Sequence, residues 1–301
     1  MLDILSFIFG GLWSGFSGIF TALANPAAWL DWSEASAKIR FIYYGGSTEF
    51  FFAVFSVALI VTGVGLTKRQ VLWTTVRGIE WTSNTIGRFF AWAGLLMVLQ
   101  QVMIVFLQRI FRVSEISLGF GITFTRDLSW YSEELKLYNA MIVALCTAYT
   151  LVQGGHVRVD LFYAGMTHRG KKIVDMVGSL IFLMPTMVMV WFFGWFFMWR
   201  HLVTPKINTT DTLEALDRKS RLLKWNVETI GFSPNGFDAY FLFKVLMVAF
   251  AGLMFIQAWG FFWRSLLELI EGEESAGKYS DLDTLDDEIA AAAASAHGPE
   301  N

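Results

Sequence analysis

The side chains best suited to chemistry in this 301-residue sequence are four histidines and one cysteine. The histidines are His156, His168, His201 and His297, and the cysteine is Cys146. Two histidines that face each other inside a helical bundle could be the axial ligands of a b-type haem. His156 and His201, however, end separate hydrophobic runs that should open on opposite faces of a membrane. We therefore expect no haem, metal or other cofactor, and a lone cysteine cannot form an intrachain disulfide.

No catalytic constellation accompanies these residues. The sequence holds no Ser/His/Asp or Cys/His arrangement, no phosphate-binding loop and no dinucleotide fingerprint in a fitting context. The Gly154-Gly155 pair follows an uncharged run, and this position predicts a helix terminator instead of a phosphate cradle. The chain is therefore not expected to be an enzyme.

Candidate functional residues flank one uncharged run, Leu137–Val157. Those before the run are Trp130, Glu133 and Glu134, and those at its end or beyond are Gly155, His156, Arg158 and Asp160. The helix dipole explains an acidic pair at a helix N-terminus, although such a pair could also meet a partner subunit. A helix C-terminal cap explains the glycine and Arg158, whereas an Arg158–Asp160 contact could orient the next helix or bind a partner. Both interpretations of each group are kept.

Composition indicates an integral membrane protein. Hydrophobic residues make up 55% of the chain and charged residues 16%, against about 25% charged residues in soluble domains. The run Leu137–Val157 contains no Asp, Glu, Lys or Arg, and as a helix it would extend roughly 30 Å, enough to cross a bilayer core. The formal net charge of -3 argues against a nucleic-acid partner.

Hydropathy predicts four further spans. They are Phe50–Thr67, Phe89–Gln108, Ile173–Trp199 and Ala239–Trp263. The uncharged segment Ile4–Leu30, rich in glycine and serine, is compatible with another span or with a helix lying in the interface. Pro185, near the middle of one span, predicts a kink.

The segments between the spans differ in character. Residues 31–49 and 113–132 are expected to be polar connections, and Val71–Arg88 has the apolar spacing of an amphipathic helix at the membrane surface. A short helix is expected over Thr212–Leu223 in the long loop that follows the third of the four spans above. The acidic tail predicts a short helix followed by disorder. The predicted units are N-terminal extra membrane segments (1–67), an interfacial helix (68–88), a four-helix membrane domain (89–268) and the tail (269–301).

The predicted spans and their ends hold few uncharged polar residues. They are Gln100, Gln101, Asn139, Thr147, Thr150, Gln153 and Gln257. They do not line up with acidic groups as a proton relay or an ion pathway would require. This pattern favours hydrogen bonding between helices, within the chain or with a partner subunit.

The order of motifs from about residue 77 to 268 resembles a known family. A helix, Trp130 with the Glu133-Glu134 pair, a second helix, the sequence GHVRVD from Gly155 to Asp160, a basic turn and two more helices follow one another. This order resembles the small permease subunit, the DctQ type, of tripartite ATP-independent periplasmic (TRAP) transporters. The resemblance implies an all-α bundle of four family transmembrane helices. To these the chain adds one or two extra N-terminal membrane segments and an interfacial amphipathic helix.

The resemblance also implies a function and a location. The expected partners are a large permease subunit, a periplasmic substrate-binding protein and the lipid bilayer of the bacterial inner membrane. This subunit would be a scaffold for sodium-coupled uptake of organic acids. The resemblance places the GHVRVD hinge and the C-terminus in the cytoplasm. The distribution of positive charge alone does not decide this orientation. Segments 68–88 and 158–175 each carry four Lys or Arg, but 200–244 carries seven. The alternatives are a membrane anchor of a respiratory enzyme and a self-contained channel.

Overall fold

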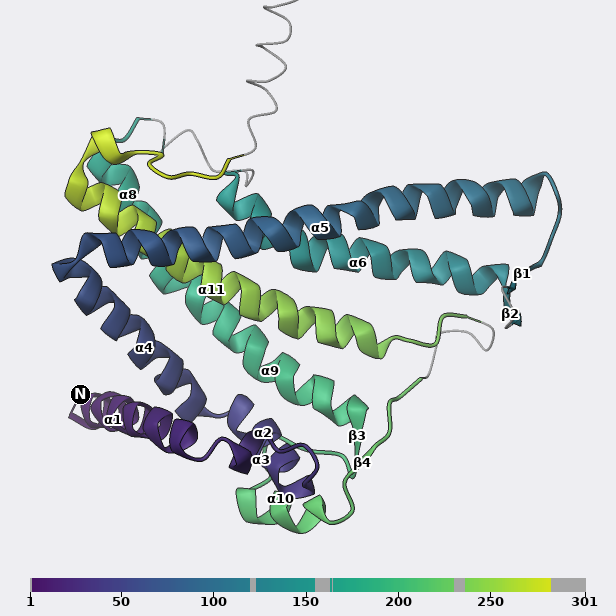
Figure 1. The fold of residues 1–301 in the computed structure, drawn as a ribbon, viewed down its shortest axis with the longest axis horizontal. Helices are drawn as coiled ribbons and strands as arrows, with labels where there is room; N and C mark the ends of the chain where they lie inside the picture. Colours follow the sequence, from purple (N-terminus) through teal and green to yellow (C-terminus); the bar gives the residue numbers. More distant parts are fainter. Residues whose placement is uncertain (1, 120–122, 155–162, 164, 230–235, 283–301) are drawn as a thin grey trace, which may run out of the picture.

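The structure is a computed structural model that describes residues 2–119, 123–154, 163, 165–229 and 236–282 (Figure 1). Within these ranges, six helices are long and apolar enough to cross a membrane. The prediction of an all-α integral membrane protein is confirmed, with two short two-stranded antiparallel sheets outside the spans.

The elements follow one another without an internal repeat. The first part comprises α1 (Leu2–Ala24), α2 (Ala27–Leu30), α3 (Ala35–Gly45), α4 (Thr48–Thr67) and α5 (Arg69–Arg109). The middle comprises β1 (Glu115–Gly119), β2 (Thr123–Asp127), α6 (Leu128–Val152), α8 (His168–Gly178), a π turn (Ser179–Leu183) and α9 (Met184–Leu202). The last part comprises β3 (Val203–Thr204), α10 (Leu213–Ser220), β4 (Lys224–Trp225), α11 (Phe241–Glu271) and a 3-10 turn (Glu273–Ser275). β1 pairs with β2, and β3 with β4, both antiparallel.

Side-chain caps explain where several helices begin. The oxygens of Ser47, Asp127, Thr167 and Thr212 accept hydrogen bonds from backbone N–H groups two or three residues later. Each cap satisfies one of the N–H groups that a helix start leaves without a partner. The cap at Thr212 starts α10 inside the interval where the sequence predicts a short helix.

Residues 69–109 form one 41-residue helix, α5, where the sequence predicts a surface helix followed by a separate span. Hydropathy changes between Arg88 and Phe89, but no proline interrupts the backbone hydrogen bonds. At 1.5 Å per residue this helix is about 60 Å long, twice the thickness of a bilayer core. Its first half buries a stripe of residues spaced three or four apart, whereas its second half exposes most of its apolar side chains.

A π turn precedes Pro185, where the sequence predicts a kink. The Met184 N–H donates to the Ser179 carbonyl, five residues earlier. Pro185 has no N–H to donate to Ile181, and its ring would clash with that carbonyl in a regular helix. The wider turn accommodates the proline, so that α8, the π turn and α9 continue as one helical path.

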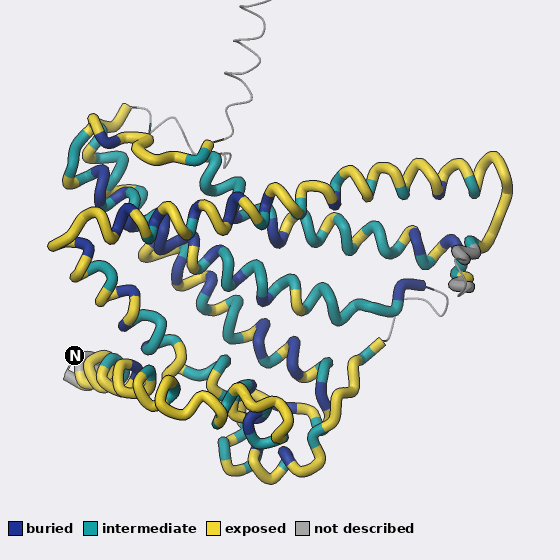
Figure 2. Tube along the Cα trace, viewed as in Figure 1, coloured by how far each residue is buried: buried dark blue, intermediate teal, exposed yellow. Residues whose placement is uncertain are grey.

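α11 occupies the centre of the bundle. It packs against α5, α6, α8 and α9, which surround it in Figure 1. α1 lies at the edge, is mostly exposed, and packs chiefly on α4 (Figure 2). The two helices can approach closely at Gly15 because glycine has no Cβ. A Cβ there would lie 2.6 Å from the Ala53 backbone nitrogen.

A small cap of non-spanning elements covers one end of the bundle. α3 packs on α10 and on the end of α9, around the buried side chains of Ile39, Ile42, Trp199 and Leu216. The prediction of a polar connection over residues 31–49 is therefore wrong, because Ala35–Gly45 is a helix. Its buried residues are separated by the charged Lys38 and Arg40, which hid the apolar stripe in the sequence.

The helix ends gather at two sides. The ends of α4 and α11 and the start of α8 lie at one side, and α10, β3, β4 and the start of α11 lie at the other (Figure 1).

Packing at Gly87 yields a testable prediction. A Cβ on Gly87 would lie 2.2 Å from the Cβ of Tyr149 on α6. We expect Gly87→Ala to lower the free energy of unfolding by about 1–3 kcal/mol, because the helices must separate. Gly78→Ala on the same helix has no atom within 4 Å of the new Cβ and should be neutral or stabilising. Melting temperatures in detergent compare the two, and equal values would contradict this account.

Candidate functional site

The start of α6 carries the first group of predicted residues. The Trp130 Nε1 donates to Asp238 Oδ1 at 3.2 Å, and Arg126 pairs with Asp238 at 3.6 Å. The Arg126 guanidinium also lies 5.7 Å from the centre of the Trp130 ring. At the cap, the Ser129 N–H and hydroxyl hold the pKa of Asp127 below its usual value. These contacts fasten the start of α6 to the segment that leads into α11.

The two glutamates of the acidic pair have different partners. Glu133 Oε2 accepts hydrogen bonds from the Phe237 N–H at 2.9 Å and the Tyr240 hydroxyl at 3.3 Å. Glu134 Oε2 accepts one from Gln100 Nε2 at 3.0 Å. Glu133 thus holds the approach to α11, and Glu134 holds α5. Both carboxylates therefore have partners within the chain. From the sequence alone, such contacts could not be distinguished from contacts with a partner subunit.

The second group of predicted residues lies outside the described part of the chain. Gly155, His156, Arg158 and Asp160 all fall in the interval 155–162. α6 ends at Val152. Gly154, two residues later, has a φ of +70°, the left-handed conformation that glycine adopts most readily. The predicted glycine helix terminator is therefore present at Gly154.

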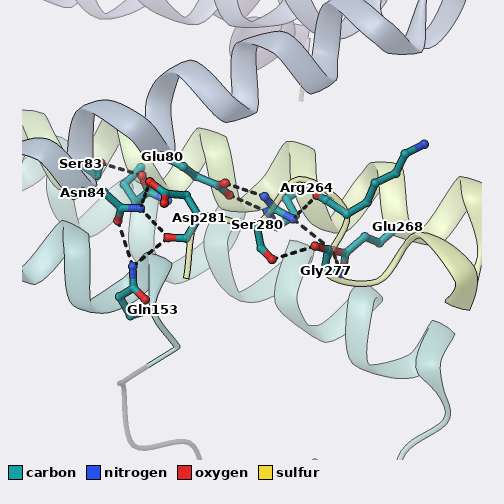
Figure 3. A network of polar contacts seen from close by, with 11 residues as sticks. Glu80, Ser83, Asn84, Gln153, Arg264, Glu268, Gly277, Ser280 and Asp281 are labelled. Carbon is teal, nitrogen blue, oxygen red and sulfur yellow. Dashed lines mark hydrogen bonds and ion pairs between the residues drawn. The ribbon is translucent and has the colours of Figure 1, made fainter. Parts of the chain in front are cut away.

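A larger polar site joins α5, α6 and α11 to the segment after α11 (Figure 3). We call it the C-terminal network, and it comprises Glu80, Ser83, Asn84, Arg88, Gln153, Lys172, Gln257, Arg264, Glu268, Gly277 and Asp281. The sequence analysis did not combine these residues, because they come from five segments. The available sequence signals were the charged Glu80 and Arg264 in largely apolar helices and the polar Gln153 and Gln257 of the predicted spans.

An ion pair lies at the centre of the C-terminal network. Glu80 on α5 accepts two hydrogen bonds from Arg264 on α11, both at 2.5 Å. The Glu80 side chain is 5% exposed and that of Arg264 is 14% exposed. Glu268, one turn later on α11, pairs with Lys172 on α8 and lies 3.6 Å from Arg264. Two buried carboxylates are thus matched by two cations from different helices, as burial of charge requires.

The segment after α11 folds back onto this site. Asp281 accepts from Asn84 Nδ2 through its carbonyl at 2.8 Å and its carboxylate at 2.9 Å. Its carboxylate pairs with Arg88 at 3.2 Å, and its carbonyl accepts from Gln153 Nε2 at 3.0 Å. Nearby, the Gly277 N–H donates to Glu268. Residues 272–282, which the sequence assigns to the tail, therefore pack against α5 and α6, and residues 283–301 lie outside the described chain.

The polar residues predicted inside the spans separate into two classes. Gln100 and Gln153 bond within the chain, and Gln257 accepts from Ser83 at 2.8 Å. Gln101 and Asn139 are exposed on the helix surfaces. The prediction that such side chains join helices holds for the first three.

The described histidines lie apart from one another. His168 contacts the Glu268 carbonyl at 3.3 Å, whereas His201 contacts the Phe197 carbonyl and pairs with Glu228 at 3.3 Å. Across the described ranges, no group of three or more His, Cys, Asp or Glu side chains could hold a metal ion.

Comparison with known proteins gives one match. The family model described as "Tripartite ATP-independent periplasmic transporters, DctQ component" matches residues 120–216. This interval begins between β1 and β2 and extends through α6, α8 and α9 into α10. No curated protein and no solved structure matches the chain. The match confirms the family resemblance over residues 120–216, and the N-terminal helices, α5 and α11 lie outside the matched interval.

The buried ion pair generates the second prediction. Replacing Arg264 with methionine leaves Glu80 buried without its cation, so we expect a loss of about 3–5 kcal/mol in the free energy of unfolding. Arg218→Met, on the exposed face of α10, is the control and should change little. The double variant Glu80→Leu/Arg264→Met should regain much of the loss, because no buried charge then lacks its partner. Denaturant titrations in detergent measure all three, and a double variant as unstable as Arg264→Met would argue against this pairing.

Proposed function

We propose, on the premise that residues 120–216 are a DctQ domain, that this multi-pass chain is the small membrane subunit of a tripartite transporter. In this role it is a scaffold in the bacterial inner membrane that holds the large permease subunit while that subunit moves. Its other expected partner is a periplasmic substrate-binding protein. We extend the proposal to sodium-coupled uptake of organic acids, which rests on the family alone.

The observation that carries the proposal is the family match. The geometry agrees with a scaffold, since the C-terminal network fastens α5, α6, α8 and α11 to one another. The contacts of Glu133 and Glu134 fasten the opposite end of α6 in the same way. A subunit bonded at both ends of its central helices resists shear, as a fixed support for a moving partner must.

The partner surface is expected on α5. Its second half exposes large apolar side chains that no described element of this chain covers, among them Phe89, Trp92, Leu96, Leu99 and Phe106. Such a surface faces lipid or another membrane helix. We further propose that Arg158 and Asp160 form a contact that orients the next helix or meets the partner, and that Gly155 and His156 are further candidates for such contacts.

Co-purification tests the assembly. With an affinity tag on this chain alone, the mild-detergent eluate should contain a larger membrane protein in roughly equal amount. Leu99→Arg places a charge on the exposed face of α5, so it should reduce recovery of the larger protein. Thr74→Arg, on an exposed position in the first half of α5, is the matched control. Transport by this chain alone after reconstitution would favour the channel, and a haem absorbance would favour the respiratory anchor.

Cysteine labelling tests the orientation. In a Cys146→Ala background, Arg169→Cys on α8 and Asp217→Cys on α10 both present exposed positions. The proposed topology places α8's start in the cytoplasm and α10 in the periplasm. A membrane-impermeant maleimide should therefore label the α10 position in intact cells and the α8 position only after permeabilisation. The reverse pattern would invert the chain in the membrane.

A further inference from the structure

A polar contact at the end of α9 joins His201 to Glu228, which lies in the segment after β4. Two backbone hydrogen bonds run beside this contact. The Asn226 N–H donates to the Leu202 carbonyl at 3.0 Å, and the Glu228 N–H donates to the His201 carbonyl at 2.9 Å. The segment after β4 therefore lies along the end of α9 as far as Glu228. His201 is inside the DctQ match, whereas Glu228 is outside it.

Both ring nitrogens of His201 face oxygen atoms that accept hydrogen bonds. Nδ1 lies 2.7 Å from the Phe197 carbonyl oxygen, and Nε2 lies 3.3 Å from Glu228 Oε2. A neutral imidazole has a single N–H, so one of its nitrogens would turn a lone pair toward a carbonyl or an ionised carboxylate, which cannot donate. The protonated ring supplies a donor to each oxygen. This geometry therefore favours the imidazolium form.

The charged neighbours of His201 come from three elements. Arg200 precedes it in the last turn of α9 and is exposed. The Lys244 ammonium of α11 lies 5.0 Å from the centre of the Phe197 ring, and it interacts electrostatically with Glu228 and with Lys206. These cations oppose a further positive charge on the ring. The Glu228 carboxylate and the carbonyl groups at the C-terminal end of α9 offset them, because both favour a cation at this position.

The two side chains of the contact are partly shielded from water. The His201 side chain is 16% exposed and the Glu228 side chain is 32% exposed. The Phe197 ring packs edge-on against the imidazole, with ring centres 4.8 Å apart, and so fixes the direction of the ring. A charge pair shielded in this way interacts more strongly than a fully exposed pair.

We propose that His201 and Glu228 form a pH-sensitive latch that fastens the segment after β4 to the end of α9. Histidine is the side chain that ordinarily titrates between about pH 5 and pH 8. The protonated ring has the Glu228 carboxylate as its partner in the folded chain and lacks it in the unfolded chain, so proton binding favours the latched state. The latch therefore holds at low pH and weakens as the pH rises through the titration of the ring.

The latch acts on the connection that leads to α11. Beyond Glu228 the chain continues to Phe237, whose N–H donates to Glu133 at the start of α6. The connection is thus held to α9 at one end and to α6 at the other, and the hold on α9 includes the titratable pair. Under the topology given above, which rests on the proposed function, this side of the molecule faces the periplasm. The latch would then respond to the pH of that compartment.

Thermal unfolding of the purified full chain in detergent tests the latch at about pH 5.5 and about pH 8, on either side of the usual histidine titration. Glu228→Gln removes the charge and keeps the size of the side chain, and His201→Gln removes the ring. The double variant His201→Gln/Glu228→Gln completes the cycle. Glu214→Gln is the matched control, because Glu214 is an exposed glutamate on α10 of the same loop.

At the lower pH, Glu228→Gln should lower the melting temperature by about 2–4 °C. At the higher pH it should leave the melting temperature unchanged or raise it, since the glutamine amide can donate to Nε2 of the neutral ring. In the His201→Gln chain, the change at Glu228 should have the same effect at both pH values, as should Glu214→Gln in the unaltered chain.

Hydrogen exchange provides a local measurement. After correction for the intrinsic effect of pH, the protection of residues 226–229 should fall between the lower and the higher pH in the unaltered chain but not in Glu228→Gln. An equal loss of melting temperature at both pH values would overturn the proposal, and so would a pH-dependent loss that persists without His201. None of these measurements involves a permease, so their outcome is separate from the test of the proposed function.

Discussion

A charge buried between apolar helices must be paired, and the Glu80–Arg264 contact satisfies this constraint at the centre of the molecule. The pair fixes the register of α5 on α11, since a shift of one residue would turn either side chain away from the other. Glu268, one turn along α11, extends the pairing to Lys172 on α8. Around these charges pack Leu72, Trp259 and other apolar side chains of the same interface.

The same interface holds the segment after α11. Asp281 reaches Asn84, Arg88 and Gln153, so that it connects α5 to α6 beside the ion pairs. The first half of α5 therefore behaves as part of the bundle and carries polar contacts on its buried face. Its second half lies beyond that network and exposes apolar residues. One continuous helix thus carries an inner half fixed in the bundle and an outer half whose apolar side chains are exposed.

The N-terminal segment adds a second unit at the other end of the bundle. α1 packs against α4, whereas α3 packs into the aromatic cap formed with α9, α10 and the β3–β4 sheet. Trp195 Nε1 donates to the Ile42 carbonyl at 2.7 Å, and Trp191 Nε1 donates to the Gly45 carbonyl at 2.8 Å. These bonds fix α3 on the span that belongs to the matched domain. The extension is therefore integrated with the family domain and alters its surface.

The sequence by itself determined the membrane class, the approximate candidate spans and the resemblance of residues 120–216 to the DctQ component. Long uncharged runs such as Leu137–Val157 are sufficient for this, because the bilayer demands about 20 apolar residues whatever the tertiary structure. Local chemistry also located the short helix after Thr212 and the glycine terminator after α6, since caps act over a few residues. Glu133 and Glu134 could be named as candidates for the same reason.

Only the tertiary structure decided which polar groups meet. Glu80 and Arg264 are 184 residues apart, and Asn84 and Asp281 are 197 residues apart. No spacing rule connects such positions, because their contact depends on how α5 lies across α11. The continuity of α5 through Arg88 and Phe89 could not be predicted from the sequence for a different reason. Hydropathy indicates whether a segment lies in lipid or in water, but it does not indicate whether the backbone hydrogen bonds of a helix continue. The aromatic cap around Trp199 likewise exists only because α3 folds onto α9 and α10, which follows from packing and not from local sequence.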